Sequence, residues 1–391
     1  MPTVEELDAI TPEALRAAGS LKWTKYGAGT LGAFVAEMDF GTAPAVTAAL
    51  HAAVERQQFG YLSYGVAAAM SDACATWQAE RYGWAVSPEH VTPLLDVLHG
   101  LELTIDHFSR PGSPVILPVP AYMPFLEVPD RHGRATLPVT MVRDGNRHVY
   151  DLDALDEAFR AGGHLLVLCN PYNPLGRVME PAELDAIAAV VERHGGCVFA
   201  DEIHAPIVYP GHAHTPYASR SATAAAHTIT ATSATKAWNL AGLKCAQLIL
   251  SNANHRAHLA TLDPHLAQDA SMLGAIASTA AYAAGGPWLA DVLAYLDGNR
   301  RLLGELLTEH LPDIGYTPPE GTYLAWLDCR AFDLPADLED DLVERAGVAI
   351  VDGARCGAPG RGFVRLNIAT SRPILTRIVE QLAAAIRSAR G

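Results

Sequence analysis

Residues His227 to Gln247 read HTITATSATKAWNLAGLKCAQ and place Lys236 between two short apolar runs. The first run, Thr228 to Ala231, is rich in β-branched residues, which favour strands. The second run, Ala246 to Leu250, follows a turn that contains glycine. We therefore predict a tight loop that carries Lys236 between two buried strands. An unpaired buried ammonium is costly, so a lysine in this position either reaches water or serves a function.

Four apolar runs along the chain are each followed at once by polar residues, and amphipathic helical patterns separate them. One such pattern, Ala182 to His194, carries its apolar residues on one face and ends at two glycines. This alternation predicts an α/β fold with a mostly parallel sheet and helices on both sides. The runs and the segments after them are Val115 to Val119 before PAYMPF, Leu165 to Cys169 before NPYNPLG, Cys197 to Ala200 before DEIH, and Thr228 to Ala231 before TSATK.

The polar side chains that follow these runs should collect along one edge of the sheet. Ligands of open α/β sheets bind beyond the carboxyl ends of the strands, which is where these residues fall. Asn and Asp also favour ordinary turns, so each residue taken alone has a simpler explanation. The regular placement of the whole set is what indicates a site. The set comprises Tyr122, Asn170, Asn173, Asp201, His204 and Lys236.

The length of 391 residues predicts two domains, because one hydrophobic core seldom extends so far. We expect a large domain over residues 41–285, with helices at Ala43 to Gln58 and Ala67 to Tyr82 before the alternating region. A smaller α+β domain would combine residues 1–40 with residues 286–391. That second part has a long helix from Pro287, strands at GTYLAWLDC and GFVRLNIA, and a final helix after Pro373.

Composition excludes several classes of protein. Half of the residues are hydrophobic and the mean hydropathy is +0.11, which predicts a large core. The net charge of −15 and a pI near 5.5 argue against nucleic acid as a partner, because phosphate binding needs a basic face. The sequence contains no run of 18 or more uncharged apolar residues, so we predict no membrane-spanning helix. The acidic N-terminus is unlike a signal peptide, so we expect a cytoplasmic protein.

The six cysteines are scattered, and neither they nor the sixteen histidines show the spacing of a metal site. Cys169, Cys197 and Cys245 each lie in an apolar run, as small buried hydrophobic residues do. We expect reduced core cysteines and no metal.

A buried lysine, an aspartate, an asparagine and an aromatic side chain at one sheet edge match the requirements of pyridoxal 5'-phosphate (PLP). In such a site the lysine forms the Schiff base and moves protons, while the aspartate keeps the pyridine nitrogen protonated so that the ring accepts electrons. Asp96 to Leu98 is a candidate phosphate cradle, because a helix start offers unpaired amide groups.

The motifs NPYNPLG, DEIH and SATKAWNLAGLK occur in an order and at separations similar to those of the fold type I PLP-dependent enzymes, the class I/II aminotransferases and their relatives. The resemblance covers nearly the whole chain. It implies the fold type I transferase architecture, with a seven-stranded-type sheet in the large domain and PLP as cofactor.

The resemblance also implies a role for each matching residue. Lys236 would be the Schiff-base lysine, Asp201 the partner of the pyridine nitrogen, and Arg365 the arginine that grips the substrate α-carboxylate. Tyr122 would stack on the ring, and both it and Asn173 would also border the substrate. Further cofactor contacts would come from Asn173 and His204 to the ring oxygen, from Val97, Leu98, Ser233 and Lys244 to the phosphate, and from Tyr61 to the phosphate of the other subunit of a homodimer.

Within this family the N-terminal half looks most like the MalY/PatB-type cystathionine β-lyases. The shared words are LKW at Leu21 to Trp23, AEMDF at Ala36 to Phe40, and FGY at Phe59 to Tyr61. Two departures stand out: Glu37 replaces the usual aspartate of ADMDF, and Asp96 stands in the window where a glycine-valine-valine sequence is usual. A carboxylate there must cap the helix or point away from a phosphate.

The resemblance implies a C–S β-lyase that cleaves cystathionine or another cysteine S-conjugate to a thiol, pyruvate and ammonia. Lys236 would remove the Cα proton, and the β-thiolate would then leave. The same residues would also serve an aminotransferase or a decarboxylating, aldehyde-forming enzyme of secondary metabolism. A PLP-binding regulator that acts through protein contact is a further alternative. The LKW and MDF motifs favour the lyase.

Overall fold

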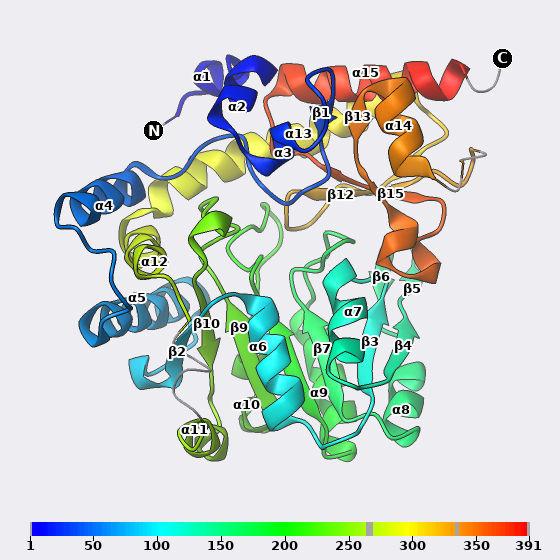
Figure 1. Cartoon of the computed structure of the whole chain (residues 1–391). Coiled ribbons are helices and arrows are strands. Elements are labelled where there is room, and N and C mark those ends of the chain that lie inside the picture. The colour runs from blue at the N-terminus through cyan, green and yellow to red at the C-terminus, as the bar shows by residue number, and fades with distance from the viewer. Residues whose placement is uncertain (1, 263–268, 333–334, 336, 389–391) are drawn as a thin grey trace.

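The computed structural model describes residues 2–262, 269–332, 335 and 337–388. Its centre is a seven-stranded sheet in the order β2-β10-β9-β8-β7-β3-β4 (Figure 1). Strand β10 is antiparallel to both of its neighbours, and the other adjacent pairs are parallel. The predicted α/β fold with a mostly parallel sheet is confirmed. The strands are β2 (Val91–Leu94), β3 (Val115–Val119), β4 (Thr136–Thr140), β7 (Leu165–Cys169), β8 (Cys197–Asp201), β9 (Thr228–Thr232) and β10 (Ala246–Ile249).

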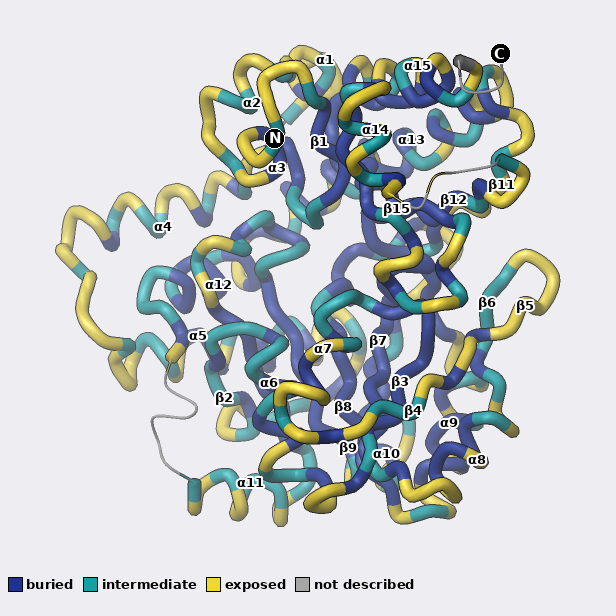
Figure 2. The backbone as a smooth tube through the Cα atoms, turned by 45° about the vertical axis from the view of Figure 1, so that its right-hand side comes forward, coloured by how far each residue is buried: buried dark blue, intermediate teal, exposed yellow. Residues whose placement is uncertain are grey.

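Helices cover both faces of this sheet. One group lies in front in Figure 1 and consists of α6 (Val97–Leu103) and α7 (Met123–Arg131). The other consists of α8 (Leu152–Arg160), α9 (Pro181–Arg193) and α10 (Ala222–His227), which contact one another in succession. Helix α9 begins and ends one residue before the predicted helix. Every residue of β3, β7, β8 and β9 is buried, as expected for parallel strands covered on both faces (Figure 2).

Further helices flank the β2 edge of the sheet: α4 (Pro44–Glu55), α5 (Tyr64–Tyr82), α11 (Ala253–Leu259) and α12 (Met272–Ala284). Helix α5 begins three residues earlier than predicted because Ser63 accepts a hydrogen bond from the Val66 amide and caps the helix. Helix α4 projects from the molecule, and much of its surface is exposed (Figure 2).

A four-stranded antiparallel sheet, β11-β12-β15-β14, lies above the large sheet in Figure 1. Helices α13 (Gly286–His310), α14 (Leu338–Ala346) and α15 (Arg372–Ser388) accompany it. Helix α15 includes Pro373 in its first turn, where the missing N–H costs nothing. The strands are β11 (Gly315–Tyr316), β12 (Leu324–Asp328), β14 (Val351–Asp352) and β15 (Phe363–Asn367).

The N-terminal segment joins this second sheet region rather than the large sheet. It contains α1 (Val4–Asp8), α2 (Pro12–Ala18) and α3 (Leu21–Thr24), followed by β1 (Leu31–Gly32). Strand β1 pairs in parallel with β13 (Val348–Ala349), so residues from both parts of the expected small domain lie side by side. We propose the division into residues 41–285 and residues 1–40 with 286–391, and this pairing supports it. No helix among the described residues is both long and apolar enough to span a membrane.

Candidate active site

A cavity of about 330 Å³ lies at the carboxyl edge of the large sheet and is closed on its other side by the N-terminal segment and β15. It brings together ten of the twelve residues expected at the site. Tyr61 is one exception, because it lies fully exposed between α4 and α5. Asn170 also lies apart, since its side chain accepts a bond from the Met179 amide. The ten are Val97, Leu98, Tyr122, Asn173, Asp201, His204, Ser233, Lys236, Lys244 and Arg365.

Lys236 follows β9 in the predicted loop, and its Nζ donates a hydrogen bond to the carbonyl oxygen of Ala36 at 3.1 Å. Burial, and then the positive charge of Arg365, lower the pKa of Lys236 to about 8. At this pKa roughly a tenth of the amine is neutral at pH 7, far more than for an ordinary lysine. A neutral amine can act as a nucleophile and accept a proton.

Asp201 ends β8 and is 4% exposed. Its Oδ1 accepts a hydrogen bond from the Ile203 amide at 3.0 Å, and its Oδ2 lies 3.9 Å from the thiol of Cys169. Burial raises the pKa of Asp201 to about 7. Asp201 forms no ion pair with a described residue, and the positive charge of Lys236 only partly offsets the effect of burial on this pKa.

Arg365 lies in the middle of β15 and is buried. Its Nη1 donates to Oδ1 of Asn173 at 3.1 Å, and its Nη2 donates to the carbonyl of Phe34 at 2.9 Å. No described residue accepts a bond from its Nε, and burial lowers the pKa of the guanidinium. A buried guanidinium with one unpaired donor is suited to bind a carboxylate.

Asp96 occupies the N-cap of α6, and its Oδ1 accepts a hydrogen bond from the His99 amide at 3.0 Å. Its Oδ2 accepts a bond from Nζ of Lys244 at 2.9 Å. The departure in this window is therefore accommodated by helix capping. The amides of Val97 and Leu98 occupy the first turn of α6, where a helix provides no internal acceptor.

Ser233 Oγ donates to the Cys245 carbonyl at 2.7 Å, which ties the loop after β9 to the segment that starts β10. Tyr122 precedes α7, and its ring meets Phe125 edge to face at 5.4 Å between centroids. Both residues line the cavity, but neither arrangement identifies a ligand on its own.

Comparison with known proteins identifies the family. The model of the aminotransferase class I and II family matches residues 35–382. The chain belongs to this family. It is 36% identical to a cystathionine β-lyase of Corynebacterium glutamicum, over 96% of this chain and 98% of the relative. It is 31% identical to the cystathionine β-lyase PatB of Bacillus subtilis, over 94% and 96%.

A solved structure extends the likeness from sequence to fold. Cystalysin from Treponema denticola, whose crystal structure contains PLP, superimposes with a TM-score of 0.91 at 26% identity. The match covers 98% of this chain and 99% of cystalysin. The fold type I architecture of the aminotransferase family is thus shown over nearly the whole chain.

The cavity of this family member fits PLP by the chemistry of its side chains. Asp201 is a buried acid that would gain stability beside a protonated pyridine nitrogen. Burial lowers the pKa of His204 to about 3, so its imidazole is neutral, and no described residue bonds its Nδ1. The carboxylate of Asp201 would therefore be stabilised by a cation, and Nδ1 of His204 by a hydrogen-bonding group.

Several contacts that position the site were not predicted from the sequence. Ala36 O accepts from Lys236 and also from the hydroxyl of Tyr323, at 2.9 Å. Asn367 Nδ2 donates to the carbonyls of Val35 and Glu37 at 2.6 and 2.7 Å. Residues 35–37, which include the start of AEMDF, therefore position the site through their backbone. Their side chains carry no signal of that role.

Asn239, three residues after Lys236, clamps the same segment. Its side chain accepts a hydrogen bond from the Met38 amide and donates one to the Met38 carbonyl, each at 2.9 Å. Its φ of +58° lies in the left-handed region that asparagine tolerates better than most residues. Asn239 lies within the stretch His227 to Gln247, so an asparagine three residues after Lys236 is the sequence signal that could have revealed this contact.

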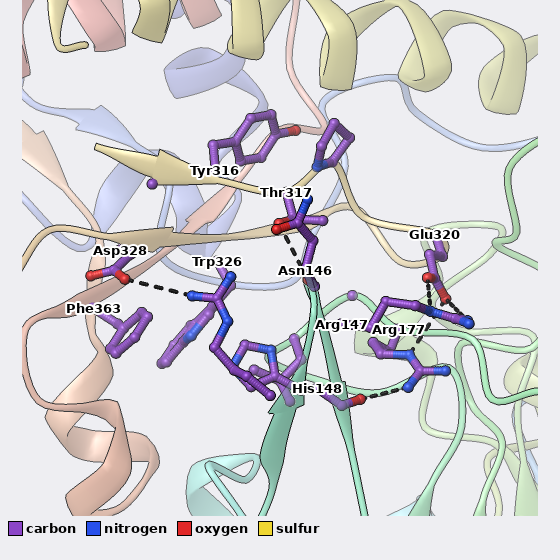
Figure 3. Close-up of a pocket in the computed structure, with 15 residues that line it drawn as sticks. Asn146, Arg147, His148, Arg177, Tyr316, Thr317, Glu320, Trp326, Asp328 and Phe363 are labelled. Carbon is purple, nitrogen blue, oxygen red and sulfur yellow. Dashed lines mark hydrogen bonds and ion pairs between the residues drawn. The ribbon is translucent and has the colours of Figure 1, made fainter. Parts of the chain in front are cut away.

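A second cavity of about 230 Å³ lies where the β5–β6 hairpin, formed by Val142–Asp144 and Arg147–Val149, meets the four-stranded sheet (Figure 3). Its charged groups pair with one another: Arg147 Nε donates to Glu320 at 2.9 Å, and Arg177 lies 3.6 Å from the same carboxylate. Trp326 and Phe363 stack at 5.2 Å between centroids. The Arg147–Glu320 pair joins the hairpin to the loop before β12, whereas the ring stack lies within the four-stranded sheet.

Proposed function

We propose that this chain is a PLP-dependent C–S β-lyase that cleaves cystathionine or another cysteine S-conjugate to a thiol, pyruvate and ammonia. The observation that carries the proposal is the convergence of Lys236, Asp201 and Arg365 on one cavity in a chain 36% identical to a cystathionine β-lyase. Fold alone would not select this reaction, because the family supports several.

The proposed cofactor contacts follow the predicted roles. Lys236 would hold PLP covalently, Asp201 would bind the pyridine nitrogen, and Asn173 and His204 would bind the ring oxygen. The first amides of α6 at Val97 and Leu98, with Ser233 and Lys244, would bind the phosphate. Tyr122 would lie against the ring.

When bound, PLP supplies an electron sink that stabilises negative charge at the substrate Cα. Arg365 binds the α-carboxylate and so orients the Cα–H bond toward the amine of Lys236. Lys236, whose pKa is about 8, takes the proton. The Cβ–S bond then breaks, and the sulfur leaves with the bonding electrons as a thiolate. Water replaces the amino group, which gives pyruvate and ammonia without net oxidation or reduction.

The test is to supply cystathionine and S-alkyl cysteines with and without a 2-oxo acid, and to assay thiol, pyruvate and ammonia. The lyase requires stoichiometric release of all three without the oxo acid. Strict dependence on the oxo acid, with formation of a new amino acid, would assign aminotransfer instead. Lys236→Ala is the control and should abolish both reactions.

We further propose a homodimer in which Tyr61 reaches the phosphate of the other subunit. Support comes from the aromatic side chains of Phe59, Tyr61 and Tyr64, which are 62%, 100% and 89% exposed beside the projecting α4. Exposed apolar groups gathered in this way mark interaction surfaces. A second copy of the chain would cover them.

We also propose that the protein works in the cytoplasm. All six cysteines are free and buried, as is usual where thiols remain reduced. Cell fractionation followed by immunoblotting tests this location, and recovery outside the cytoplasmic fraction would refute it.

A further inference from the structure

The lining of the candidate active site is cationic, although the whole chain carries a net charge of −15. Among the described residues that line the cavity, cationic side chains outnumber carboxylates. This local excess indicates that the cavity is built for anionic groups. The cationic side chains are Lys25, Lys236, Lys244, Arg355 and Arg365, and the carboxylates are Asp96 and Asp201.

The proposed function uses only part of this positive charge. Lys236 and Lys244 are assigned to the cofactor, and Arg365 is assigned to the substrate α-carboxylate. Lys25 and Arg355 are left without a role in either. Both are exposed, which places them where the cavity opens to water.

Lys25 and Arg355 are each linked to Arg365 through a shared neighbour. The Phe34 carbonyl accepts from Arg365 at 2.9 Å, and the Lys25 ammonium lies 5.0 Å from the centre of the Phe34 ring. Met123 Sδ lies 3.9 Å from Arg365 Nη1 and 3.8 Å from the thiol of Cys356, the residue after Arg355.

Lys25 and Arg355 each have N–H donors that can bind a further anionic group. No described carboxylate forms an ion pair with Lys25, whose ammonium lies over the rings of Tyr26 and Phe34 instead. Arg355 binds Glu339, but both of these bonds start at Nη1, and 52% of its side chain remains exposed. A guanidinium has five N–H donors, so Arg355 can bind a second carboxylate while it keeps Glu339.

We propose that Lys25 and Arg355 form a subsite for an anionic group at the far end of the departing thiol. This inference rests on the proposed lyase function and specifies its substrate class as cysteine S-conjugates whose thiol carries a terminal carboxylate. With the α-carboxylate on Arg365, the sulfur substituent extends between Phe34 and Met123 toward the two cations. Cleavage of the Cβ–S bond then releases the carboxylate with the thiolate.

The test compares S-(2-carboxyethyl)-L-cysteine with S-propyl-L-cysteine, which differ chiefly in whether the substituent ends in a carboxylate or a methyl group. We expect kcat/KM to favour the carboxylate by roughly tenfold at low salt, as two partly exposed ion pairs would give. Added salt should reduce the preference. Lys25→Gln and Arg355→Gln should each lower the ratio about threefold, and the double variant should bring it near one. Arg160→Gln, which removes a charge from α8 outside the cavity, should leave the ratio unchanged.

A binding experiment separates this inference from the function on which it rests. Calorimetry with Lys236→Ala, which cannot carry out elimination, should give tighter binding of the carboxyethyl compound than of the propyl compound. Equal affinities and equal kcat/KM values would overturn the subsite while leaving the lyase intact. Failure of the wild type to cleave cystathionine as well as both compounds would overturn the lyase, and the calorimetric difference would still decide the subsite.

Discussion

Lys236 and Asp201 have pKa values shifted in opposite directions by the same cause. Burial lowers the pKa of the amine to about 8 and raises that of the carboxyl to about 7, so each group loses part of its preference for the charged form. Burying either group in its charged form lowers the stability of the folded chain. The full penalty applies to Asp201 above about pH 7 and to Lys236 below about pH 8. We infer that the site is organised for a ligand that restores those charges.

Asp201→Asn should stabilise the cofactor-free protein at alkaline pH. The carboxyl has an ordinary pKa of 3.8 when unfolded and about 7 when folded, so between these values the folded state binds more protons and stability falls as pH rises. The full penalty is present above pH 7. Thermal unfolding at pH 5 and pH 8 should therefore show a larger gain in Tm for the variant at pH 8.

The control for that comparison is Asp185→Asn. Asp185 lies at the surface, and its hydrogen bond with Arg220 lowers its pKa, so this substitution should give no stabilisation at pH 8. A gain for Asp201→Asn that is equal at both pH values would contradict the charge argument. Asp201→Asn should also lose elimination activity, because a neutral amide cannot hold the pyridine nitrogen protonated.

Arg365→Lys should retain a positive charge but lose much of the activity. A lysine cannot donate simultaneously to Asn173 and Phe34 in the planar geometry of a guanidinium, nor bind a carboxylate in a bidentate manner. We expect kcat/KM for an S-conjugate to fall by roughly 10- to 100-fold, corresponding to the loss of about 1.5–3 kcal/mol from a charged hydrogen bond. Steady-state kinetics at constant pH measures it, and an unchanged kcat/KM would remove Arg365 from the substrate site.

The charged residues that line the cavity could be picked out from the sequence. Lys236, Asp201 and Arg365 were recognisable because charged groups in apolar surroundings require a reason. The carbonyls of Phe34 and Ala36 could not be predicted, because every residue has such a group and only the tertiary structure selects which one faces the cavity.

At the scale of elements, one buried cluster fixes the N-terminal segment over the site. Lys22 Nζ lies 2.9 Å from Asp39 Oδ2, and Trp23 Nε1 donates to Asp39 Oδ1 at 2.8 Å. Lys22 also donates to the Ala369 carbonyl at 3.0 Å. The motifs LKW and MDF, which are separate in the sequence, therefore contact each other through Lys22, Trp23 and Asp39. The segment between them provides the carbonyls that bind Lys236 and Arg365.

A double-mutant cycle should show that Lys22 and Asp39 are coupled. Lys22→Met or Asp39→Asn alone leaves one buried charge without its partner and should destabilise the fold by about 3–5 kcal/mol. The double variant removes both charges, keeps an acceptor for Trp23, and should cost clearly less than the sum. Urea unfolding of the four proteins measures this, and additive losses would refute the coupling.

The inner strands of the large sheet could be predicted closely, because strands buried on both faces read as continuous apolar runs. The edge strands β2 and β4 were not among the predicted apolar runs, and β4 is only partly buried. Strands β3 and β7 have the predicted bounds. The parallel pairing of β1 with β13 could not be predicted, since each contributes two residues separated by more than 300 positions. Local pattern carries no information about such a distant contact.

At the scale of the whole molecule, the placement of Tyr61 requires a second chain if it serves the site at all. The residue lies outside the cavity formed by its own chain and is fully exposed. In a symmetric dimer each surface meets its counterpart, so both subunits would exchange the same residue. The phenol would then bind the phosphate as a donor to a charged acceptor, a bond worth about 1.5–3 kcal/mol.

Subunit complementation tests this exchange directly. Lys236→Ala lacks the catalytic amine but keeps Tyr61, whereas Tyr61→Ala should bind PLP roughly 10- to 100-fold more weakly and lose activity at limiting cofactor. After the two variants are mixed, unfolded and refolded together, each mixed dimer has one site with both groups intact. Random association should restore about a quarter of the wild-type activity, because half of the dimers are mixed and each has one complete site. Tyr64→Ala in place of Tyr61→Ala is the matched control for loss of an exposed aromatic residue. Activity of the mixture no greater than the mean of the two parents would mean that Tyr61 does not act across the dimer.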